Sequence, residues 1–214
     1  MRLGTLLLST AIAAYPQGLS VGVKAGVPLT DAFHTGSNGP LQFFSQTKRL
    51  TVGPTVELRL PFRLGVEFDA LYKRLNYDRN ANLVDALSLA ATTGNAWEFP
   101  LLLKYGLTPG PIKPYVAGGV SFNNLSGLTQ FTRTTFFPGS RVTAGSGIPL
   151  ELRNTFRSGA VVGAGLELHA LVLRISPEIR YTRWDRDSFA DSCCGGGIFR
   201  SNRNQADFLL GITF

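Results

Sequence analysis

The chain has 214 residues, enough for one domain of ordinary size or two small ones. Hydrophobic residues make up 44% and charged residues 16%, with a formal net charge of +7. This composition excludes a disordered chain, which requires low hydrophobicity and high charge. The 24 glycines among 214 residues exceed the usual share of about 7%, so we expect an all-β protein.

The first fourteen residues are typical of a short secretory signal peptide. Arg2 supplies a positive charge, an apolar stretch follows, and Ala11 and Ala13 form an A-x-A triplet. We therefore predict a signal peptide at residues 1–14 and an exported domain at residues 15–214. The alternative is a buried strand or helix at the amino terminus. Beyond this segment no window holds 18 uninterrupted apolar residues, so the sequence predicts no transmembrane helix.

From Leu19 onward, apolar and polar residues alternate in separate segments. In the first, Leu19, Val21 and Val23 fall on one face of a strand, whereas Ser20 and Lys24 fall on the other. The alternation predicts eight strands, at residues 19–29, 50–60, 63–73, 97–106, 115–123, 159–168, 171–181 and 207–214.

The connections between these strands alternate in length. Long loops are expected at residues 30–49, 78–94, 126–156 and 187–203, and tight turns at 61–62, 108–111 and 169–170. An even number of strands with long loops at one end predicts an antiparallel up-and-down transmembrane β-barrel of the bacterial outer membrane, with short periplasmic turns and four long extracellular loops. Leu83, Val84, Leu87 and Ala91 in the second loop fit either a short helix or a hairpin tip.

The same alternation would suit a soluble barrel of the lipocalin type, with its apolar face inward. Three features favour a charged lumen and an apolar face in lipid instead. Glycines on the polar face suit a crowded interior; they are Gly22, Gly26, Gly53, Gly65, Gly119, Gly163, Gly165 and Gly211. Aromatic residues on the apolar face lie near strand ends, as at bilayer interfaces; they are Tyr72, Trp97, Tyr105, Phe122, Tyr181 and Phe214.

The third feature is the balance of charge on the polar face. Its bases are Lys24, Arg59, Lys73, Lys104, Arg174 and Arg180, and its acids are Glu57, Glu67, Asp69, Glu98, Glu167, Glu178 and Asp207. Opposite charges in nearly equal number are what a paired network in a narrow lumen requires, because an unpaired buried charge is very costly. We therefore predict that the charged face points inward.

With these features the chain resembles the eight-stranded outer-membrane β-barrel family, the OmpA-type and OmpX-type transmembrane domains, from about Leu19 to Phe214. The most specific element is the last strand, residues 205–214, which ends on an aromatic residue with apolar residues at every second position before it. In the family this ending resembles the signal read by the barrel-assembly machinery. The resemblance implies outer-membrane lipid and lipopolysaccharide as surroundings, and a monomer. Because Phe214 is the last residue, we expect no counterpart of the peptidoglycan-binding domain of full-length OmpA.

Few residues are candidates for chemistry. His34 is predicted in the first long loop and His169 at a tight turn, at opposite ends of the barrel, so they cannot serve one site. A histidine-activated serine could only combine His34 with Ser37, or with a loop carboxylate such as Asp31. The adjacent Cys193 and Cys194 lack zinc-site spacing; they could form a strained vicinal disulfide, an intermolecular link or two thiols. We predict no catalytic, cofactor-binding or metal-binding residue, and no cofactor.

The function favoured by these patterns is that of a non-catalytic outer-membrane protein that supports the envelope or makes surface contacts through its loops. The alternatives are a lipid-modifying enzyme and a narrow solute channel, although side chains fill the interior of an eight-stranded barrel. The bases are dispersed along strands, which argues against nucleic-acid binding.

The third loop is the most suggestive of the four. It is mildly basic, with Arg133, Arg141 and Arg153 against Glu151, and such arginines either keep the loop soluble or pair with lipopolysaccharide phosphates. Its aromatic residues, Phe131, Phe136 and Phe137, indicate a contact surface or an extension of the strands above the membrane.

Overall fold

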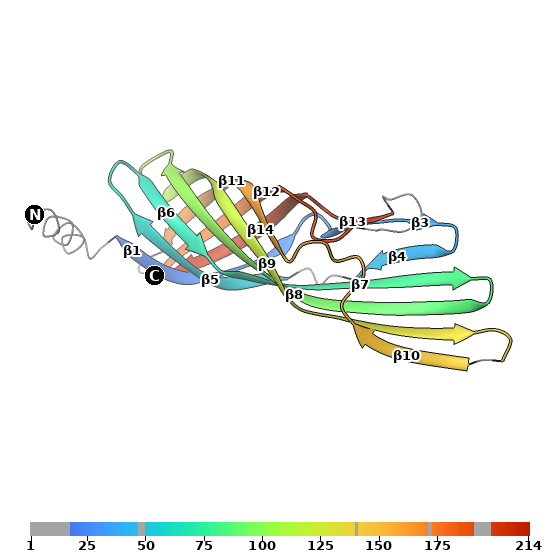
Figure 1. Ribbon diagram of the computed structural model, residues 1–214. Coiled ribbons are helices and arrows are strands. Elements are labelled where there is room, and N and C mark those ends of the chain that lie inside the picture. Colours follow the sequence, from blue (N-terminus) through green and yellow to red (C-terminus); the bar gives the residue numbers. More distant parts are fainter. Residues whose placement is uncertain (1–17, 47–49, 140, 171–172, 191–197) are drawn as a thin grey trace, which may run out of the picture.

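The computed structural model describes residues 18–46, 50–139, 141–170, 173–190 and 198–214, and the predicted signal peptide lies outside this part of the chain. Eight antiparallel segments form a closed ring in the order β1-β5-β6/β7-β8-β9-β11-β12-β14, and β14 pairs back with β1 to close it (Figure 1). Closure leaves the barrel without a free strand edge. The predicted antiparallel eight-stranded barrel is therefore confirmed.

The barrel segments lie close to the predicted ranges. They are β1 Leu19–Pro28, β5 Thr51–Arg59, β6 Leu64–Asp69, β7 Leu71–Leu83, β8 Ala86–Gly106, β9 Ile112–Phe136, β11 Phe156–Ala170, β12 Leu173–Trp184 and β14 Asn204–Thr213. β6 and β7 are one strand of the barrel that is interrupted at Ala70, since both lie between β5 and β8.

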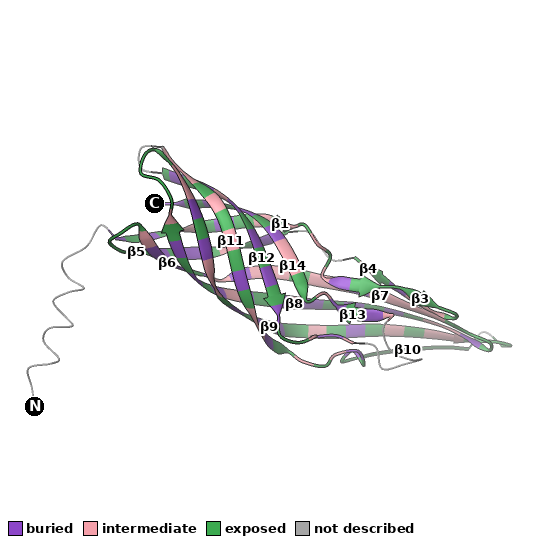
Figure 2. Ribbon diagram, turned by 90° about the horizontal axis from the view of Figure 1, so that it is seen from above, coloured by how far each residue is buried: buried purple, intermediate pink, exposed green. Residues whose placement is uncertain are grey.

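The two faces of the strands have the predicted orientation. Along β1, Leu19, Val21 and Val23 are more than half exposed, whereas Ser20 and Lys24 are buried. The same alternation follows every barrel strand, and Figure 2 shows it as stripes of buried and exposed residues across the barrel. The exposed stripes form an apolar band around the outside, and the charged face lines the interior.

Several strands continue far beyond the barrel at its long-loop end (Figure 1). β8 has 21 residues and β9 has 25, whereas a strand crosses a bilayer in about 9–11. With β10 (Arg141–Gly147), β4 (Leu41–Ser45) and β3 (Ser37–Asn38), they form an open sheet in the order β10-β9-β8-β7-β4-β3. We call this part the projecting sheet: residues 74–95 of β7 and β8, residues 128–136 of β9, and all of β10, β4 and β3.

A β-bulge marks the boundary between the barrel and the projecting sheet. The register of β8 against β9 shifts between Thr93 and Asn95, and on the β9 side Gly127 has a positive φ of 60°. A bulge bends its strand and increases the local twist. The sheet can therefore leave the curvature of the barrel at this point.

The remaining segments of the long loops fold over the mouth of the barrel. β2 (Phe33–Thr35) pairs with β13 (Phe199–Ser201), which joins the first and fourth loops. Buried side chains from the first and fourth long loops and from β7, β8 and β9 form one hydrophobic cluster, which we call the mouth cluster; its members are Phe33, Phe43, Tyr77, Ala96, Leu125, Phe189 and Phe199.

Two segments predicted as long loops contain strands. For residues 78–94 the structure shows the hairpin of β7 and β8, the second of the two predicted alternatives, and the strands continue through most of the predicted loop. Most of residues 126–147 belongs to β9 and β10. His169 and Ala170, predicted at a tight turn, pair in β11 with Arg174 and Leu173 of β12, and residues 171–172 lie outside the described part of the chain. Among the described residues there is no helix long and apolar enough to cross a membrane.

Candidate functional site

The centre of the barrel contains a buried network of opposite charges. The Arg180 guanidinium contacts three carboxylates, at 2.9 Å from Asp69, 2.8 Å from Glu178 and 3.1 Å from Glu67. Lys24 donates to Glu67 and lies 3.1 Å from Glu178. Each of these side chains is almost fully buried. Burial is tolerable because every charge has opposite charges and hydrogen bonds around it.

The network continues toward the short-turn end. Lys104 Nζ lies 2.8 Å from Glu57 and 3.1 Å from Glu67, and 4.2 Å above the ring of Tyr115. Below it, Glu167 is contacted by Arg59 at 3.4 Å. These contacts join strands that are far apart in sequence, so they cross the lumen and hold the barrel wall together from inside.

Toward the long-loop end, the interior changes character. Lys73 Nζ lies 3.1 Å from Asp207 and 3.0 Å from Glu98, so this lysine forms ion pairs with both carboxylates. Arg157 lies in the same region, with its guanidinium 4.4 Å from the centre of the Trp184 ring. Among the described residues, neither Nε nor Nη1 of this buried arginine has a hydrogen-bond partner.

The structure places all thirteen charged residues predicted for the lumen on the inner face, but sequence reasoning missed Arg157. The predicted strand began at Gly159, two residues too late. Arg157, Gly159 and Val161 share one face of β11, because side chains two residues apart point the same way. Extending the alternation by one step would have identified this base.

Most of the inward glycines occupy positions where no side chain fits; the exception is Gly65, where a Cβ atom would lie 3.5 Å from its nearest neighbour. A Cβ atom at Gly119 would lie 2.0 Å from the carbonyl oxygen of Leu101 on the neighbouring strand, and one at Gly165 would lie 2.6 Å from Tyr115 Oη. These distances are far inside van der Waals contact. The prediction that glycine marks restricted space in the lumen is confirmed at these sites, and at Gly119 the restriction comes from backbone.

The projecting sheet has an outer face that continues the lipid-facing side of the barrel strands. The strand register aligns Phe44, Ala91 and Phe131 in one row across β4, β8 and β9, with Asp78 of β7 between the first two. Phe131 is 54% exposed and Phe44 46%. The next row holds Leu89 beside Arg133. The outer face is therefore a sparsely charged surface with large exposed apolar side chains.

The inner face of the projecting sheet is anchored near the barrel mouth. Glu151, from the segment after β10, accepts hydrogen bonds from Arg79 Nη1 at 2.7 Å and from Tyr77 Oη at 3.2 Å. Tyr77 lies above the membrane-crossing part of β7. Burial, and then the Glu151 carboxylate beside it, raise the pKa of the Tyr77 hydroxyl well above its usual range. The hydroxyl therefore stays protonated at physiological pH and donates a hydrogen bond to Glu151.

The candidate catalytic residues are not assembled into a site. His34 lies in β2 and Ser37 in β3, both are exposed, and no hydrogen bond joins them in the described chain. His169 lies inside the opposite end of the barrel, with Nε2 3.2 Å from Glu167. In the described part of the molecule no three His, Cys, Asp or Glu side chains are grouped so as to hold a metal ion. Cys193 and Cys194 fall outside the described residues.

Comparison with known proteins places the fold. No family model matches the sequence, and no curated protein matches it significantly. The outer membrane protein OprG of Pseudomonas aeruginosa is similar in structure, with a TM-score of 0.53 at 13% identity over 92% of this chain and 94% of that chain. Neisserial surface protein A gives a TM-score of 0.43 at 12% identity, over 92% of this chain and 96% of that one.

A third solved structure, the attachment invasion locus protein Ail of Yersinia pestis, gives a TM-score of 0.30 at 10% identity, over 92% of this chain and 99% of that one. At such low sequence identities a structural similarity shows the fold alone. The assignment of the fold rests on the comparison with OprG, which has the highest TM-score of the three. The chain has the fold of the eight-stranded outer-membrane β-barrels.

Proposed function

We propose that this chain is an exported, non-catalytic outer-membrane protein of a Gram-negative bacterium that makes surface contacts through its projecting sheet. The observation that carries the proposal is the row of Phe44, Ala91 and Phe131 on a sheet that extends well beyond the barrel. Exposed apolar patches on folded proteins mark contact surfaces. Here the patch lies on a rigid, hydrogen-bonded sheet, which limits the entropy lost on binding.

The outer-membrane location is supported by the two faces of the barrel. Apolar side chains such as Val23, Leu101 and Ile175 face outward all around the ring, and the charges are inside. A soluble barrel would expose this apolar band to water at a large free-energy cost. Trp97, Tyr105 and Tyr181 on the same outer face are suited to the bilayer interfaces. The signal peptide at residues 1–14 supplies the route of export in this proposal.

Two partners follow from the same orientation. Arg133 and Arg141 on the projecting sheet are exposed and form no ion pair with a described carboxylate, which suits pairing with lipopolysaccharide phosphates. At the other end, Phe214 points outward after β14, where the barrel-assembly machinery would read it. We propose a monomer, since the ring is closed by β1 and β14 of one chain.

The filled lumen supports a role other than conduction. Trp184, Arg180 and Lys24 are among the largest fully buried side chains, and the mouth cluster lies over the long-loop end. An interior of eight strands is about filled by its own side chains. The candidate catalytic residues also support a non-catalytic role, because His34 and Ser37 lie in separate strands at the long-loop end and His169 lies at the opposite end of the barrel.

The proposal is tested in cells and with purified protein in lipid nanodiscs. In cells, the protein should fractionate with the outer membrane and migrate anomalously on gels before heating, as folded barrels do. In nanodiscs, the wild type and the double variant Phe44→Ser/Phe131→Ser are compared for binding to lipopolysaccharide, matrix ligands and intact cells. We expect the double variant to bind at least tenfold more weakly. Recovery of the protein as a soluble periplasmic species would refute the proposal.

The matched control is Val84→Ser, which removes a 99% exposed apolar side chain from the tip of the β7–β8 hairpin without touching the outer face. Its binding should equal that of the wild type. If the double variant and the control bind alike, the outer face is not the contact surface. Release of labelled fatty acid from lipid A, or single-channel currents in planar bilayers, would favour the enzyme or the channel over a surface role.

A further inference from the structure

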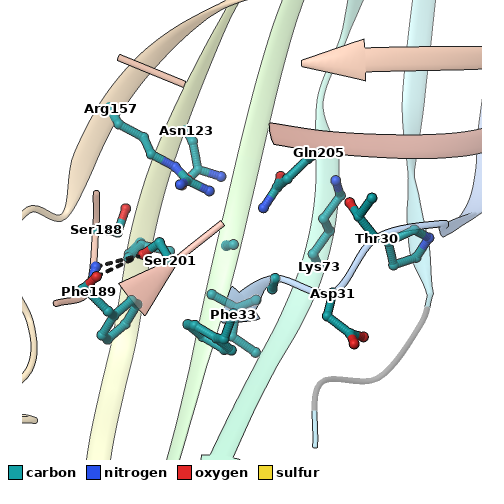
Figure 3. Close-up of a pocket in the computed structure, with 15 residues that line it drawn as sticks. Thr30, Asp31, Phe33, Lys73, Asn123, Arg157, Ser188, Phe189, Ser201 and Gln205 are labelled. Carbon is teal, nitrogen blue, oxygen red and sulfur yellow. Dashed lines mark hydrogen bonds between the residues drawn. The ribbon is translucent and has the colours of Figure 1, made fainter. Parts of the chain in front are cut away.

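A small pocket lies between the charged lumen and the mouth cluster (Figure 3). One wall is polar and comes from barrel strands, with Lys73, Asn123, Arg157 and Gln205. The opposite wall comes from the long loops and combines the rings of Phe33 and Phe189 with the polar residues Asp31, Ser188 and Ser201. The pocket is therefore amphipathic, and its volume of about 40 Å³ is room for roughly three water molecules, at about 10–15 Å³ each.

Arg157 is the unusual member of this pocket. It is only 6% exposed, yet Nε and Nη1 have no hydrogen-bond partner among the described residues. The buried bases of the central network differ, since Lys24, Lys104 and Arg180 each lie within about 3 Å of a carboxylate. Two carboxylates of the barrel interior close to Lys73, Glu98 and Asp207, both pair with that lysine, and Asp31 lines the loop side of the pocket. Leaving buried guanidinium donors unpaired costs free energy.

The surroundings of Arg157 hold its guanidinium in place. Trp184 stacks on it at 4.4 Å and donates from Nε1 to Gln205 Oε1 at 3.0 Å. Because Gln205 uses its oxygen in this bond, its amide N–H groups remain as donors. One tryptophan thus positions two donor side chains, and Figure 3 shows Arg157 and Gln205 pointing into the pocket from opposite sides.

The residue opposite Arg157 is also informative. Asn123 of β9 is its cross-strand partner in the register of β9 and β11, so the two side chains share the inner face. Cross-strand partners have Cβ atoms about 4.5–5.5 Å apart, near enough for an acidic residue at this position to pair with the arginine. The chain has a neutral amide there. Its oxygen has no hydrogen-bond partner among the described residues, and it supplies no negative charge to Arg157.

We propose that this pocket binds a small carboxylate of about the size of acetate, with its oxygens on Arg157 and the pocket donors and its methyl group against the rings of Phe33 and Phe189. The site has donors on one side and aromatic rings on the other, which fits a short carboxylate better than a spherical or fully polar anion. The occupied site would link the charged lumen to the mouth cluster and so hold the loops over the barrel.

The test uses the full-length protein in detergent, titrated calorimetrically with sodium acetate at constant ionic strength, with Trp184 fluorescence as a second readout. Acetamide, which has the same shape and no charge, is the ligand control, and sodium chloride tests a spherical anion. We expect saturable one-to-one binding of acetate, and at least tenfold weaker binding of acetamide and chloride. Equal binding of acetate and acetamide, or no saturable signal, would overturn the proposal.

Three variants locate the site. Arg157→Gln should weaken acetate binding at least tenfold, and Arg133→Gln, which removes an exposed arginine of the projecting sheet, should leave it unchanged. Asn123→Asp supplies a carboxylate from the chain itself, so it should fold and remain heat-stable but no longer bind acetate. This variant keeps the proposal testable if Arg157→Gln does not fold. Undiminished acetate binding by Asn123→Asp would show that the ligand lies elsewhere.

Discussion

Strands β8 and β9 pass through both the barrel and the projecting sheet, and their two halves are built differently. In the barrel half of β8, the inward positions include Glu98, Leu102 and Lys104, which are large or charged and buried. In the sheet half, the inward positions include Ala86 and Ala90, which are small. The outward leucines of the two halves are alike: Leu101 is 45% exposed and Leu89 42%.

Closure of the ring explains the difference. Inside a barrel every inward side chain faces other strands across a narrow lumen, so charges can be buried if they meet opposite charges. The projecting sheet has no closed wall opposite, and near the mouth it is covered by the segment that carries Glu151 and by Phe199 of β13. The outward leucines of the two halves are equally exposed, but one is proposed to face lipid and the other water. The following variants separate these environments.

The largest effect is expected where the lumen network is broken. Arg180→Met leaves Asp69, Glu67 and Glu178 buried with one base fewer, and removing one partner of a buried pair costs about 3–5 kcal/mol. The free energy of unfolding is measured by urea titration in detergent. The comparison variant Arg133→Met removes an exposed arginine from the sheet half of β9 and should change stability by no more than about 0.5 kcal/mol. A loss below 1 kcal/mol for Arg180→Met would mean that the network contributes specificity instead of stability.

The next variants compare the two leucines of β8. Leu101→Arg should lower the stability of the protein folded in lipid vesicles by about 2–4 kcal/mol, the cost of a base near the bilayer midplane. Leu89→Arg lies on the same strand and the same face but in water, and should change stability by less than about 0.5 kcal/mol. Equal effects at the two positions would show that the outer face of the barrel is not in lipid.

A smaller effect is expected from adding one methyl group to the lumen. Gly119→Ala places a Cβ against the backbone of Leu101, and such overpacking costs about 1–3 kcal/mol. Gly145→Ala on β10 meets no atom within 4 Å; it should be neutral or stabilise by at most about 1 kcal/mol. Thermal unfolding of both variants followed by circular dichroism provides the measurement. A neutral Gly119→Ala would require the two strands to move apart.

The smallest effect on stability is expected at the end of β14. Phe214 donates its backbone N–H to Val21 at 3.0 Å, but its ring is 65% exposed, so deleting the residue should cost about 1–2 kcal/mol. Yield in the outer membrane should fall much further than refolding in detergent if the terminal aromatic is read during assembly. Phe136→Ala, at the end of β9 in the projecting sheet, should leave the yield unchanged. Equal yields for the wild type and the deletion would leave Phe214 as an ordinary interfacial residue.

The sequence predicts the barrel well because the barrel requires apolar side chains on its outer face and polar or charged side chains on its inner face. Every second side chain faces apolar surroundings and every other one a charged lumen, so the period of two is visible in segments such as residues 19–29. In the strand β7 of the projecting sheet this contrast between the two faces is weak. Residues 74–82 alternate mostly between polar types, and the period cannot be recognised even though β7 continues through them. The backbone pairs there because β8 and β9 extend the same ladder.

By itself, then, the sequence determined the direction of each barrel side chain, since alternation needs only local geometry. The tertiary structure alone decided which side chains meet. Lys24 and Glu178 are 154 residues apart and in contact, and strand register and ring closure bring them together. The same is true of Arg157: alternation places it inside, but only the register of β9 and β11 shows that an amide lies opposite it, and only the folded barrel shows that Glu98 and Asp207 pair with Lys73. Pairing across a lumen depends on the positions of several strands at once, and no local pattern encodes it.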